Sequence, residues 1–324
     1  VRMLKEARGW QDGDEVITTP FTFFSTNHAI LYERLRPVFA DIDEYLCLDA
    51  ASVEERITSR TRAVMFVGLG GNAGQLARIA SLCRERSIAL ILDAAHMAGT
   101  RIGGGHIGGD ADATVWSFHS VKNLPTADGG MVSFRDAALD AAVRKWSWLG
   151  ISKDTYLRTV EDGRYKWCYD VDHVGFKYNG NSIMAALGLV GLRHLDADNE
   201  HRRDLSAVYD RELAGCPGVA PVRVAPGCVS SRHLYQALVD DRDALMVFLN
   251  ERQVFPGVHY KDNTHHPMYA YATGTCPRAR QASDRVVSLP LHIGMSRGDA
   301  ERVAAAVREF YRRPALPPQR TNPP

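Results

Sequence analysis

The hydrophobic pattern of residues 1–135 alternates short apolar runs with segments of helical spacing. The apolar runs are continuous and rich in branched side chains, which is typical of strands buried on both faces of a sheet. They cover residues 15–19, 36–42, 62–68, 88–94, 113–119 and 129–134. Residues 25–35 and 74–87 carry the helical spacing. This alternation predicts an α/β fold built on a mostly parallel sheet.

From residue 136 onward the pattern becomes mainly helical. An amphipathic helix is predicted over 136–150, and an apolar helix over 181–197 begins where Asn181 and Ser182 can cap it. A separate, charged helix is predicted over 199–215, followed by a smaller α+β domain. The chain is therefore expected to divide into three parts. They are a large domain, residues 1–197, a small C-terminal domain, residues 198–313, and an extended Pro-rich tail, residues 314–324.

Composition and charge narrow the functional classes. The chain has 324 residues, 45% of them hydrophobic and 24% charged, with a formal net charge of +1. This balance argues against nucleic acid or a membrane surface as a partner. No apolar run is as long as a membrane span, and residues 1–15 lack the apolar region of a secretory signal. The six cysteines are scattered and form no disulfide or zinc pattern, so we expect a cytoplasmic protein and no metal site.

Two side chains of opposite charge follow two of the predicted strands. Asp93 lies at the end of the run at 88–94, and Lys122 comes shortly after the run at 113–119, near Ser117. Ligands of open parallel sheets bind beyond the carboxyl ends of the strands, so both groups are candidates for chemistry. A structural ion pair between them is the alternative that the residues alone leave open.

Residues 102–109, IGGGHIGG, contain glycines of the kind that phosphate-binding loops use. They lack the strand-then-helix context, and no ribose-binding acid follows at the expected distance. We therefore predict a flexible loop here. A nicotinamide-dependent oxidoreductase has no other support in the sequence.

A lysine at the mouth of a buried strand, near a carboxylate, suits covalent chemistry with a carbonyl compound. Pyridoxal phosphate (PLP) meets that description. Its aldehyde bonds lysine, a carboxylate keeps its ring nitrogen protonated, and hydroxyl and backbone N–H groups bind its phosphate. PLP is therefore the predicted cofactor.

Six segments in the same order extend this interpretation to a family. They are GDEVITTPFTFFSTNHAIL, RPVFADID, LILDAAHMAG, WSFHSVKNLPTADGGMVSF, GFKYNGNSIMAALGLVGL and GVHYK. With these segments the chain resembles the DegT/StrS-type sugar aminotransferases, which are fold-type-I PLP enzymes acting on nucleotide-linked keto-sugars. The resemblance runs from about residue 11 to residue 310. It implies a large PLP-binding domain with a mostly parallel sheet and a smaller α+β C-terminal domain.

The resemblance also assigns roles around the cofactor. Lys122 matches the lysine that bonds the cofactor aldehyde and moves protons during transamination. Asp93 matches the carboxylate that pairs with the ring nitrogen. His96 falls beside the ring hydroxyl, Phe23 falls where an aromatic side chain stacks on the ring, and Ser117 matches a serine that binds the phosphate.

Further segments of the resemblance concern the substrate and a partner subunit. Asn179 belongs to a segment, GFKYN, that reaches the partner's site and contacts the phosphate, although related sequences also carry Asn in place of Lys177. His233, His259 and Tyr260 lie in segments that border the sugar site. The resemblance thus implies a homodimer with shared active sites.

The implied activity is transfer of an amino group from a donor, L-glutamate, to a nucleotide-linked keto-sugar such as a dTDP- or UDP-4-keto-6-deoxyhexose. A PLP-dependent sugar dehydratase is an alternative, but such relatives commonly replace the lysine with histidine, whereas this chain has Lys122. A catalytically silent, regulatory relative is the second alternative.

The resemblance has one gap at the start of the chain. Family members carry a longer segment before GDEVI, with a Ser-Gly-Thr stretch whose helix N-terminus binds the phosphate. Here VRMLKEARGWQ stands in front of that motif. We expect either that the sequence is part of a longer protein or that it binds PLP weakly.

Overall fold

A computed structural model describes residues 1–151 and 170–313, so the predicted tail at 314–324 lies outside the described residues. A six-stranded sheet forms the centre of the N-terminal part, in the order β2-β1-β3-β4-β7-β8. Its strands are β1 (Glu15–Thr18), β2 (Arg36–Phe39), β3 (Thr61–Val67), β4 (Ala89–Asp93), β7 (Ala113–Ser117) and β8 (Gly130–Phe134). All neighbours are parallel except β7 and β8. The predicted mostly parallel α/β sheet is confirmed, and all six predicted strands are present.

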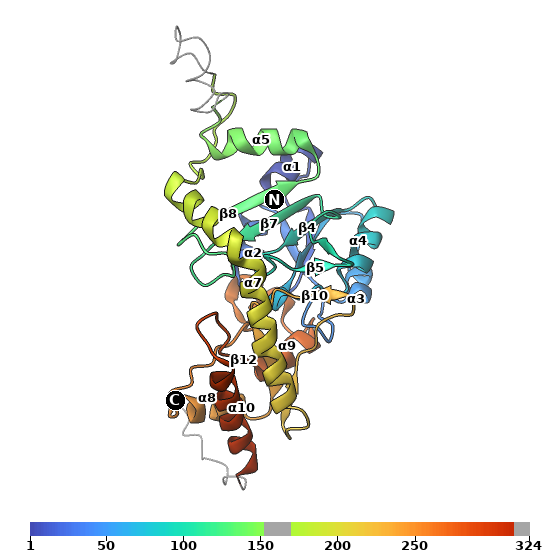
Figure 1. Ribbon diagram of the computed structural model, residues 1–324. Helices are drawn as coiled ribbons and strands as arrows, with labels where there is room; N and C mark the ends of the chain where they lie inside the picture. Colours follow the sequence, from blue (N-terminus) through green and yellow to red (C-terminus); the bar gives the residue numbers. More distant parts are fainter. Residues whose placement is uncertain (152–169, 314–324) are drawn as a thin grey trace.

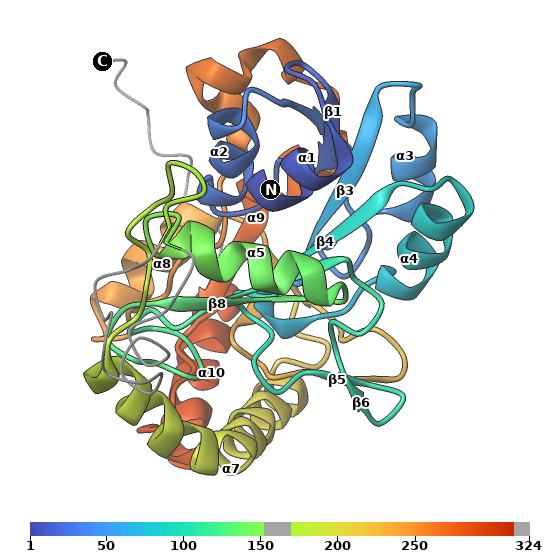
Figure 2. The same cartoon turned by 90° about the horizontal axis from the view of Figure 1, so that it is seen from above.

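Helices cover both faces of this sheet. They are α1 (Arg2–Arg8), α2 (Ser25–Tyr32), α3 (Ala50–Glu55), α4 (Leu76–Glu85) and α5 (Ala137–Ser147). Figures 1 and 2 place α3 and α4 on one side of the strands and α1 and α5 on the other. The reason is the alternation of side chains along each strand. In β4, Leu90 and Leu92 pack in the core with α3 and α4, whereas Ile91 packs in the core with α1 and α5.

One long helix, α7 (Ser182–Glu212), replaces the two helices that the sequence predicted. Asn181 caps it as expected, because its side chain accepts a hydrogen bond from the Met184 N–H. The expected break near residue 198 is wrong. The charged residues there belong to one continuous helix. In that helix Asn199 is completely buried, and Leu195 is buried as well. The predicted domain division at 197/198 falls inside α7 and remains a prediction.

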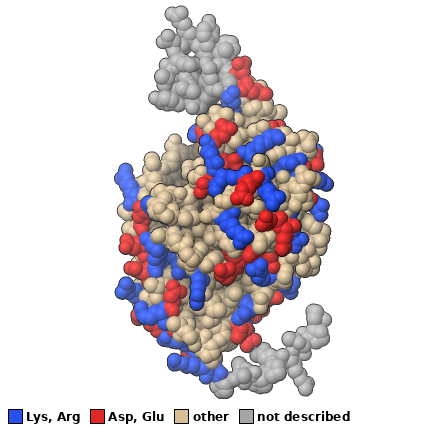
Figure 3. All heavy atoms as spheres, turned by 90° about the vertical axis from the view of Figure 1, so that its right-hand side faces the viewer, with Lys and Arg blue, Asp and Glu red and all other residues tan. Residues whose placement is uncertain are grey.

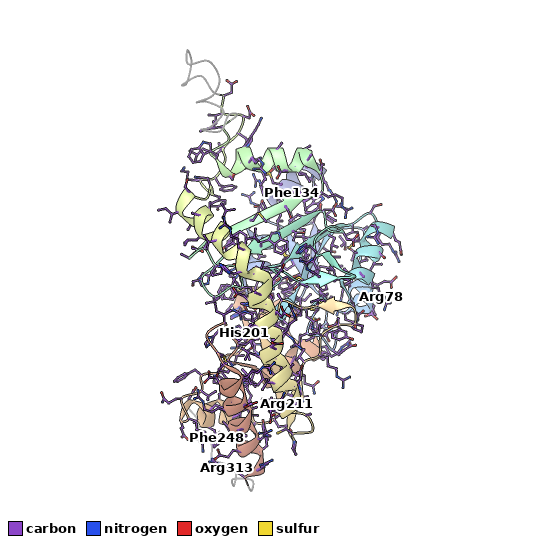
Figure 4. The ribbon with its side chains drawn as sticks, in the orientation of Figure 1. Arg78, Phe134, His201, Arg211, Phe248 and Arg313 are labelled. Carbon is purple, nitrogen blue, oxygen red and sulfur yellow. The ribbon has the colours of Figure 1, made fainter. Side chains whose placement is uncertain are left out.

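The C-terminal part has a core of its own at the lower end of α7 (Figure 1). Three antiparallel strands form its sheet, in the order β12-β11-β9. Its elements are β9 (Val219–Pro221), β11 (Tyr235–Val239), β12 (Val286–Leu289), α8 (Arg242–Asn250), α9 (Pro277–Arg285) and α10 (Arg297–Arg312). At its edge the guanidinium group of Arg313 lies 4.1 Å from the Phe248 ring centre (Figure 4). The guanidinium group of Arg252 lies 3.5 Å from the same ring centre.

The Gly-rich segment is an ordered hairpin, not the flexible loop that was predicted. Strands β5 (Arg101–Ile102) and β6 (Gly105–His106) pair antiparallel, and β10 (Cys228–Val229) adds a third strand. The two turn residues, Gly103 and Gly104, both have positive φ, 57° and 84°. A two-residue hairpin turn of this kind requires positive φ at both positions, so the glycines serve the turn.

Charges of both signs are mixed on one face of the molecule. On the face shown in Figure 3, Lys and Arg are interspersed with Asp and Glu. Within the described residues, no helix is long and apolar enough to cross a membrane. Five cysteines of the described ranges are present as free thiols: Cys47, Cys83, Cys216, Cys228 and Cys276.

Candidate active site

A cavity of about 760 Å³ opens beyond the carboxyl ends of β1, β4 and β7. Its wall includes most of the residues that the sequence analysis selected: Phe23, Asp93, His96, Ser117, Lys122, His259 and Tyr260. These residues come from loops that are far apart in the sequence. The parallel strands bring those that follow β1, β4 and β7 to one edge of the sheet, because the carboxyl ends of these strands point the same way. His259 and Tyr260 come instead from the chain between α8 and α9.

Asp93 ends β4 and is held by two hydrogen bonds. Thr26 Oγ1 donates to Asp93 Oδ2 at 2.8 Å, and the Ala95 N–H donates to Asp93 Oδ1 at 3.1 Å. Thr22 continues the chain of hydroxyls, 3.1 Å from Thr26 Oγ1. Burial nevertheless raises the pKa of Asp93, and the two donors and Lys122 oppose that shift only in part.

Lys122 lies in the loop after β7, the strand next to β4 in the sheet. Burial lowers the pKa of its amine, and the negative charge of Asp93 opposes that change. Asp93 and Lys122 attract each other electrostatically, but no ion pair within contact distance joins them in the described part of the chain. The structural ion pair that the sequence left open is therefore not formed. Both groups face the cavity, available for a third partner.

An aromatic side chain lies at the mouth of the same cavity. Phe23 is 46% exposed, although it follows a buried strand. Its ring centre lies 5.9 Å from that of Tyr260 and 4.2 Å from that of Phe24. An exposed ring at this place can stack on a flat ligand.

His96 lies deep in the wall and is buried. The Gly70 N–H, in the short 3₁₀ helix η1 (Leu69–Gly71), donates to His96 Nδ1 at 3.2 Å, and Tyr260 Oη lies 3.3 Å from His96 Nε2. Burial lowers the pKa of His96 well below its usual value, and the neighbouring His233 and Lys122 lower it further. His96 is therefore neutral near pH 7.

A second cavity of about 940 Å³ shares Lys122 and His259 with the first. It lies between the loop after β7, α7 and the C-terminal part. His233 lines this second cavity but not the first. His259 Nδ1 lies 2.9 Å from Ser288 Oγ, which fixes the ring between the two cavities.

Asn179 is the one selected residue that the structure leaves outside both cavities. It is exposed, and its side-chain amide donates to the Gly180 carbonyl at 3.2 Å. Its expected role in a partner subunit's site stays a prediction.

The residues of the first cavity fit PLP. Asp93 has a pKa raised by burial and no cationic partner within ion-pair distance, which suits a protonated ring nitrogen. Phe23 offers a ring face, Ser117 offers a hydroxyl, and Lys122 is an amine whose pKa burial has lowered. No three His, Cys, Asp or Glu side chains converge in a metal-binding group anywhere in residues 1–151 and 170–313.

Two supporting residues were not found by sequence reasoning. Thr26 holds Asp93, and Asn123 makes three hydrogen bonds directly after Lys122. In the sequence, Thr26 is visible only as one of two hydroxyl residues in FFSTN, and Asn123 only as an amide next to Lys122. Neither pattern identifies the distant residue to which the side chain binds.

Comparison with known proteins adds independent information. The chain matches the model of the DegT/DnrJ/EryC1/StrS aminotransferase family over residues 2–308. It is 34% identical to the spore coat polysaccharide biosynthesis protein SpsC of Bacillus subtilis over 319 residues, which are 95% of this chain and 82% of that protein. Among solved structures it is similar to the aminotransferase TlmJ from Streptoalloteichus hindustanus, with a TM-score of 0.85, 33% identity, and coverage of 95% of this chain and 82% of that one. It is also similar to DesV of S. venezuelae, with a TM-score of 0.87, 30% identity, and coverage of 97% and 82%.

Proposed function

Because this chain belongs to the DegT/DnrJ/EryC1/StrS aminotransferase family, we propose that it moves an amino group from L-glutamate to a nucleotide-linked keto-sugar, with PLP as its cofactor. The observation that carries the proposal is the placement of Asp93 and Lys122. They leave neighbouring parallel strands into one cavity and form no ion pair with each other. We take a dTDP- or UDP-linked 4-keto-6-deoxyhexose as the substrate and amino-sugar biosynthesis as the setting.

Each residue of the first cavity has a defined task in this proposal. When bound, PLP supplies an aldehyde that bonds amines and a cationic ring that accepts electron density. Asp93, fixed by Thr26, holds the proton on the ring nitrogen. Lys122 would take a proton from the carbon next to the amino group and return it at a second carbon. The lowered pKa of its amine favours this role because it raises the neutral fraction of the amine. Phe23 covers one face of the ring.

The substrate is proposed to enter from the second cavity. Lys122 and His259 line both spaces, so a ligand in the second cavity can place its carbonyl carbon next to the Lys122 amine. His233 and the loop that carries Tyr260 border this path. We propose that they contact the sugar.

A second copy of the chain is proposed to complete the site. The N-terminal half of α7 carries large apolar side chains in contact with solvent, and it stands beside the sheet in Figure 1. The exposed apolar residues of this half-helix and of the segment just before it are Val174, Phe176, Tyr178, Ile183, Leu187, Leu189, Val190 and Leu192, and we call them together the α7 face. Apolar patches of this kind mark protein interfaces. The GFKYN segment contributes Phe176 and Tyr178 to this face, so a partner covering it would bring its own Asn179 close.

Formation of 2-oxoglutarate from glutamate tests the proposal. The PLP-loaded protein is incubated with glutamate and with a panel of dTDP- and UDP-keto-sugars. Without a keto-sugar we expect at most one equivalent of 2-oxoglutarate per site. With the right keto-sugar we expect repeated turnover, and with Lys122→Ala we expect neither. The control is Lys145→Ala, which removes a lysine on α5 that lines neither cavity. Sugar amination by Lys122→Ala would contradict the assigned role, and failure with every keto-sugar would favour a catalytically silent protein.

A further inference from the structure

A buried asparagine follows Lys122 and makes three hydrogen bonds with its side chain. Asn123 Nδ2 donates to Asn199 Oδ1 at 2.7 Å and to the Ser231 carbonyl at 2.8 Å, and Asn123 Oδ1 lies 2.8 Å from His233 Nδ1. Asn123 is only 8% exposed, and Asn199 and His233 are buried as well. The network joins the loop after β7, helix α7 and the segment before β11.

The partners fix which end of the Asn123 amide faces which group. The Ser231 carbonyl can only accept, so the NH₂ group of Asn123 must face it. Asn199 uses its own NH₂ group to donate to the Ala98 carbonyl at 2.9 Å, so its oxygen is the atom that faces Asn123. Both hydrogens of the Asn123 amide are therefore used, and its oxygen is left facing His233.

This orientation determines the tautomer of His233. Asn123 Oδ1 can only accept, so His233 Nδ1 must carry a hydrogen. Burial, and then the charges of Lys122 and Arg202, lower the pKa of His233 well below its usual value. A neutral imidazole with hydrogen on Nδ1 has an unprotonated Nε2, which is an acceptor.

The neighbouring His96 has the opposite tautomer. Its Nδ1 accepts from the Gly70 N–H, so its hydrogen lies on Nε2, which faces Tyr260 Oη. The two imidazole centres are 4.2 Å apart. The hydrogen of His96 is therefore directed at Tyr260 Oη, whereas His233 has an acceptor to offer.

No group of the described residues forms a hydrogen bond with His233 Nε2, and His233 lines the 940 Å³ cavity. The same wall also carries the Asp198 carboxylate, which is a second acceptor, together with several donors. Lys122 is a donor, and Arg202 donates to the Leu291 carbonyl at 2.9 Å. An acceptor beside them suits a ligand that carries hydroxyl groups.

We propose that Asn123 is a positioning residue, which locks His233 in the Nδ1–H tautomer and thereby makes His233 Nε2 the acceptor for a hydroxyl group of the ligand in the second cavity. The proposal rests on the proposed function only in assigning that hydroxyl to the keto-sugar. The tautomer itself follows from Asn123, Asn199 and Ser231.

Nuclear magnetic resonance of the full chain, labelled with nitrogen-15 at histidine, tests the lock directly. The His233 signals are identified by their loss in His233→Gln. We expect wild-type His233 with a protonated Nδ1 and an unprotonated Nε2. In Asn123→Ala the exclusive protonation of Nδ1 is expected to be lost. Protonation of Nε2 alone in the wild type would overturn the proposal. This measurement on the wild type does not depend on whether Asn123→Ala folds.

The matched control is Asn72→Ala. Asn72 is another buried asparagine with three hydrogen bonds, to Arg223, Gly74 and Ala225, and it lines neither cavity. His233 is expected to keep its tautomer in this variant. An unchanged tautomer in Asn123→Ala would overturn the proposal, as would a change of equal size in Asn72→Ala.

Kinetics separate the failure of this inference from that of the proposed function. We expect Asn123→Ala to lower kcat/KM for the keto-sugar by about tenfold, the effect of one lost hydrogen bond to a substrate. A keto-sugar kcat/KM equal to that of the wild type would overturn the role of Nε2. A wild type that aminates no sugar would refute the proposed function, while the tautomer measurement would still decide the lock.

Discussion

At the residue scale, Asp93 accepts hydrogen bonds from Thr26 and from the Ala95 N–H, yet burial still raises its pKa. The two donors stabilise the carboxylate without supplying a positive charge. A cationic ligand at this place therefore gains from a negative group whose orientation is already set. The same reasoning makes Thr26 important, although it touches no substrate in the proposed mechanism.

Replacing Thr26 with valine keeps the shape of the side chain and removes the hydroxyl. We expect PLP to bind about tenfold or more weakly, because a hydrogen bond to a charged group is worth about 1.5–3 kcal/mol. A titration followed by PLP absorbance measures the affinity. Thr26→Ser keeps the hydroxyl and is expected to bind PLP almost as well as the wild type. An affinity in Thr26→Val equal to that of the wild type, or a loss of equal size in Thr26→Ser, would contradict the role assigned to the hydroxyl.

The lowered pKa of Lys122 has a consequence that needs no cofactor. In the PLP-free protein, the reaction of the Lys122 amine with acetic anhydride should have a pH midpoint, which reports the pKa of the amine. We expect this midpoint to lie below about 10.4, the pKa of a solvated lysine. Asp93 opposes the shift, so Asp93→Asn should lower that midpoint further. Mass spectrometry of the peptide that contains Lys122 measures both midpoints. A midpoint that rises in Asp93→Asn would contradict the assigned electrostatics.

At the element scale, the turn between β2 and α3 contains a buried acid outside the site. Asp43 Oδ1 accepts from the Tyr45 and Cys47 N–H groups, both at 2.9 Å. Its Oδ2 atom is buried and has no hydrogen-bond partner among the described residues. Burial, opposed by those two N–H groups, raises the pKa of Asp43 to about 7. The folded protein therefore holds a proton here that the unfolded chain releases near pH 4.

This proton makes the free energy of unfolding depend on pH. The contribution of Asp43 is fully present below about pH 4 and is lost as the pH rises through 7, because the folded form must then bury a charge. We expect Asp43→Asn to remove this loss, worth roughly 3–4 kcal/mol at most. Urea unfolding at pH 5 and pH 8 measures the difference. Asp110→Asn, at an exposed site, is the control, and an unchanged pH dependence in Asp43→Asn would contradict the prediction.

Elements with a strong local pattern could be predicted from the sequence, and those set by distant contacts could not. The six strands of the main sheet were found because each is a continuous apolar run between turns. The break in α7 was wrongly predicted because the charged residues after 198 looked like a boundary. The burial of Asn199 and Leu195 there depends on partners elsewhere in the chain.

The candidate site divides in the same way. Asp93 and Lys122 could be placed together because parallel strands end at one edge. Thr26 and Asn123 were missed because their hydrogen-bond partners are distant in the sequence. The partner of Thr26 lies 67 residues away, and the partners of Asn123 lie 76, 108 and 110 residues away. Only the tertiary packing brings these side chains together.

At the scale of the whole molecule, the α7 face predicts self-association. Val190 belongs to this face and is 56% exposed, so we expect Val190→Asp to give monomers where the wild type gives dimers. Light scattering after size-exclusion chromatography measures the mass. Val247→Asp is the control, because Val247 is 59% exposed on α8, outside the α7 face. A dimer that survives Val190→Asp would place the interface elsewhere.

Shared active sites make a separate prediction about mixed dimers. If Asn179 serves the partner's site, Asn179→Ala and Lys122→Ala chains are each inactive alone. After the two are unfolded and refolded together, hybrid dimers contain one intact site, so activity should return. A mixture that stays inactive, although hybrids are shown to form, would assign Asn179 to its own subunit or to no site.

The central claim is that Lys122 and Asp93 form a PLP site competent for amino transfer. The most direct measurement is the visible absorption spectrum of the purified protein with PLP, before and after glutamate, beside Lys122→Ala. We expect a visible band from the lysine-bound cofactor, its loss on addition of glutamate, and its return with a keto-sugar nucleotide. The band should be absent in Lys122→Ala. No band in the wild type, or a band that glutamate leaves unchanged, would contradict the claim.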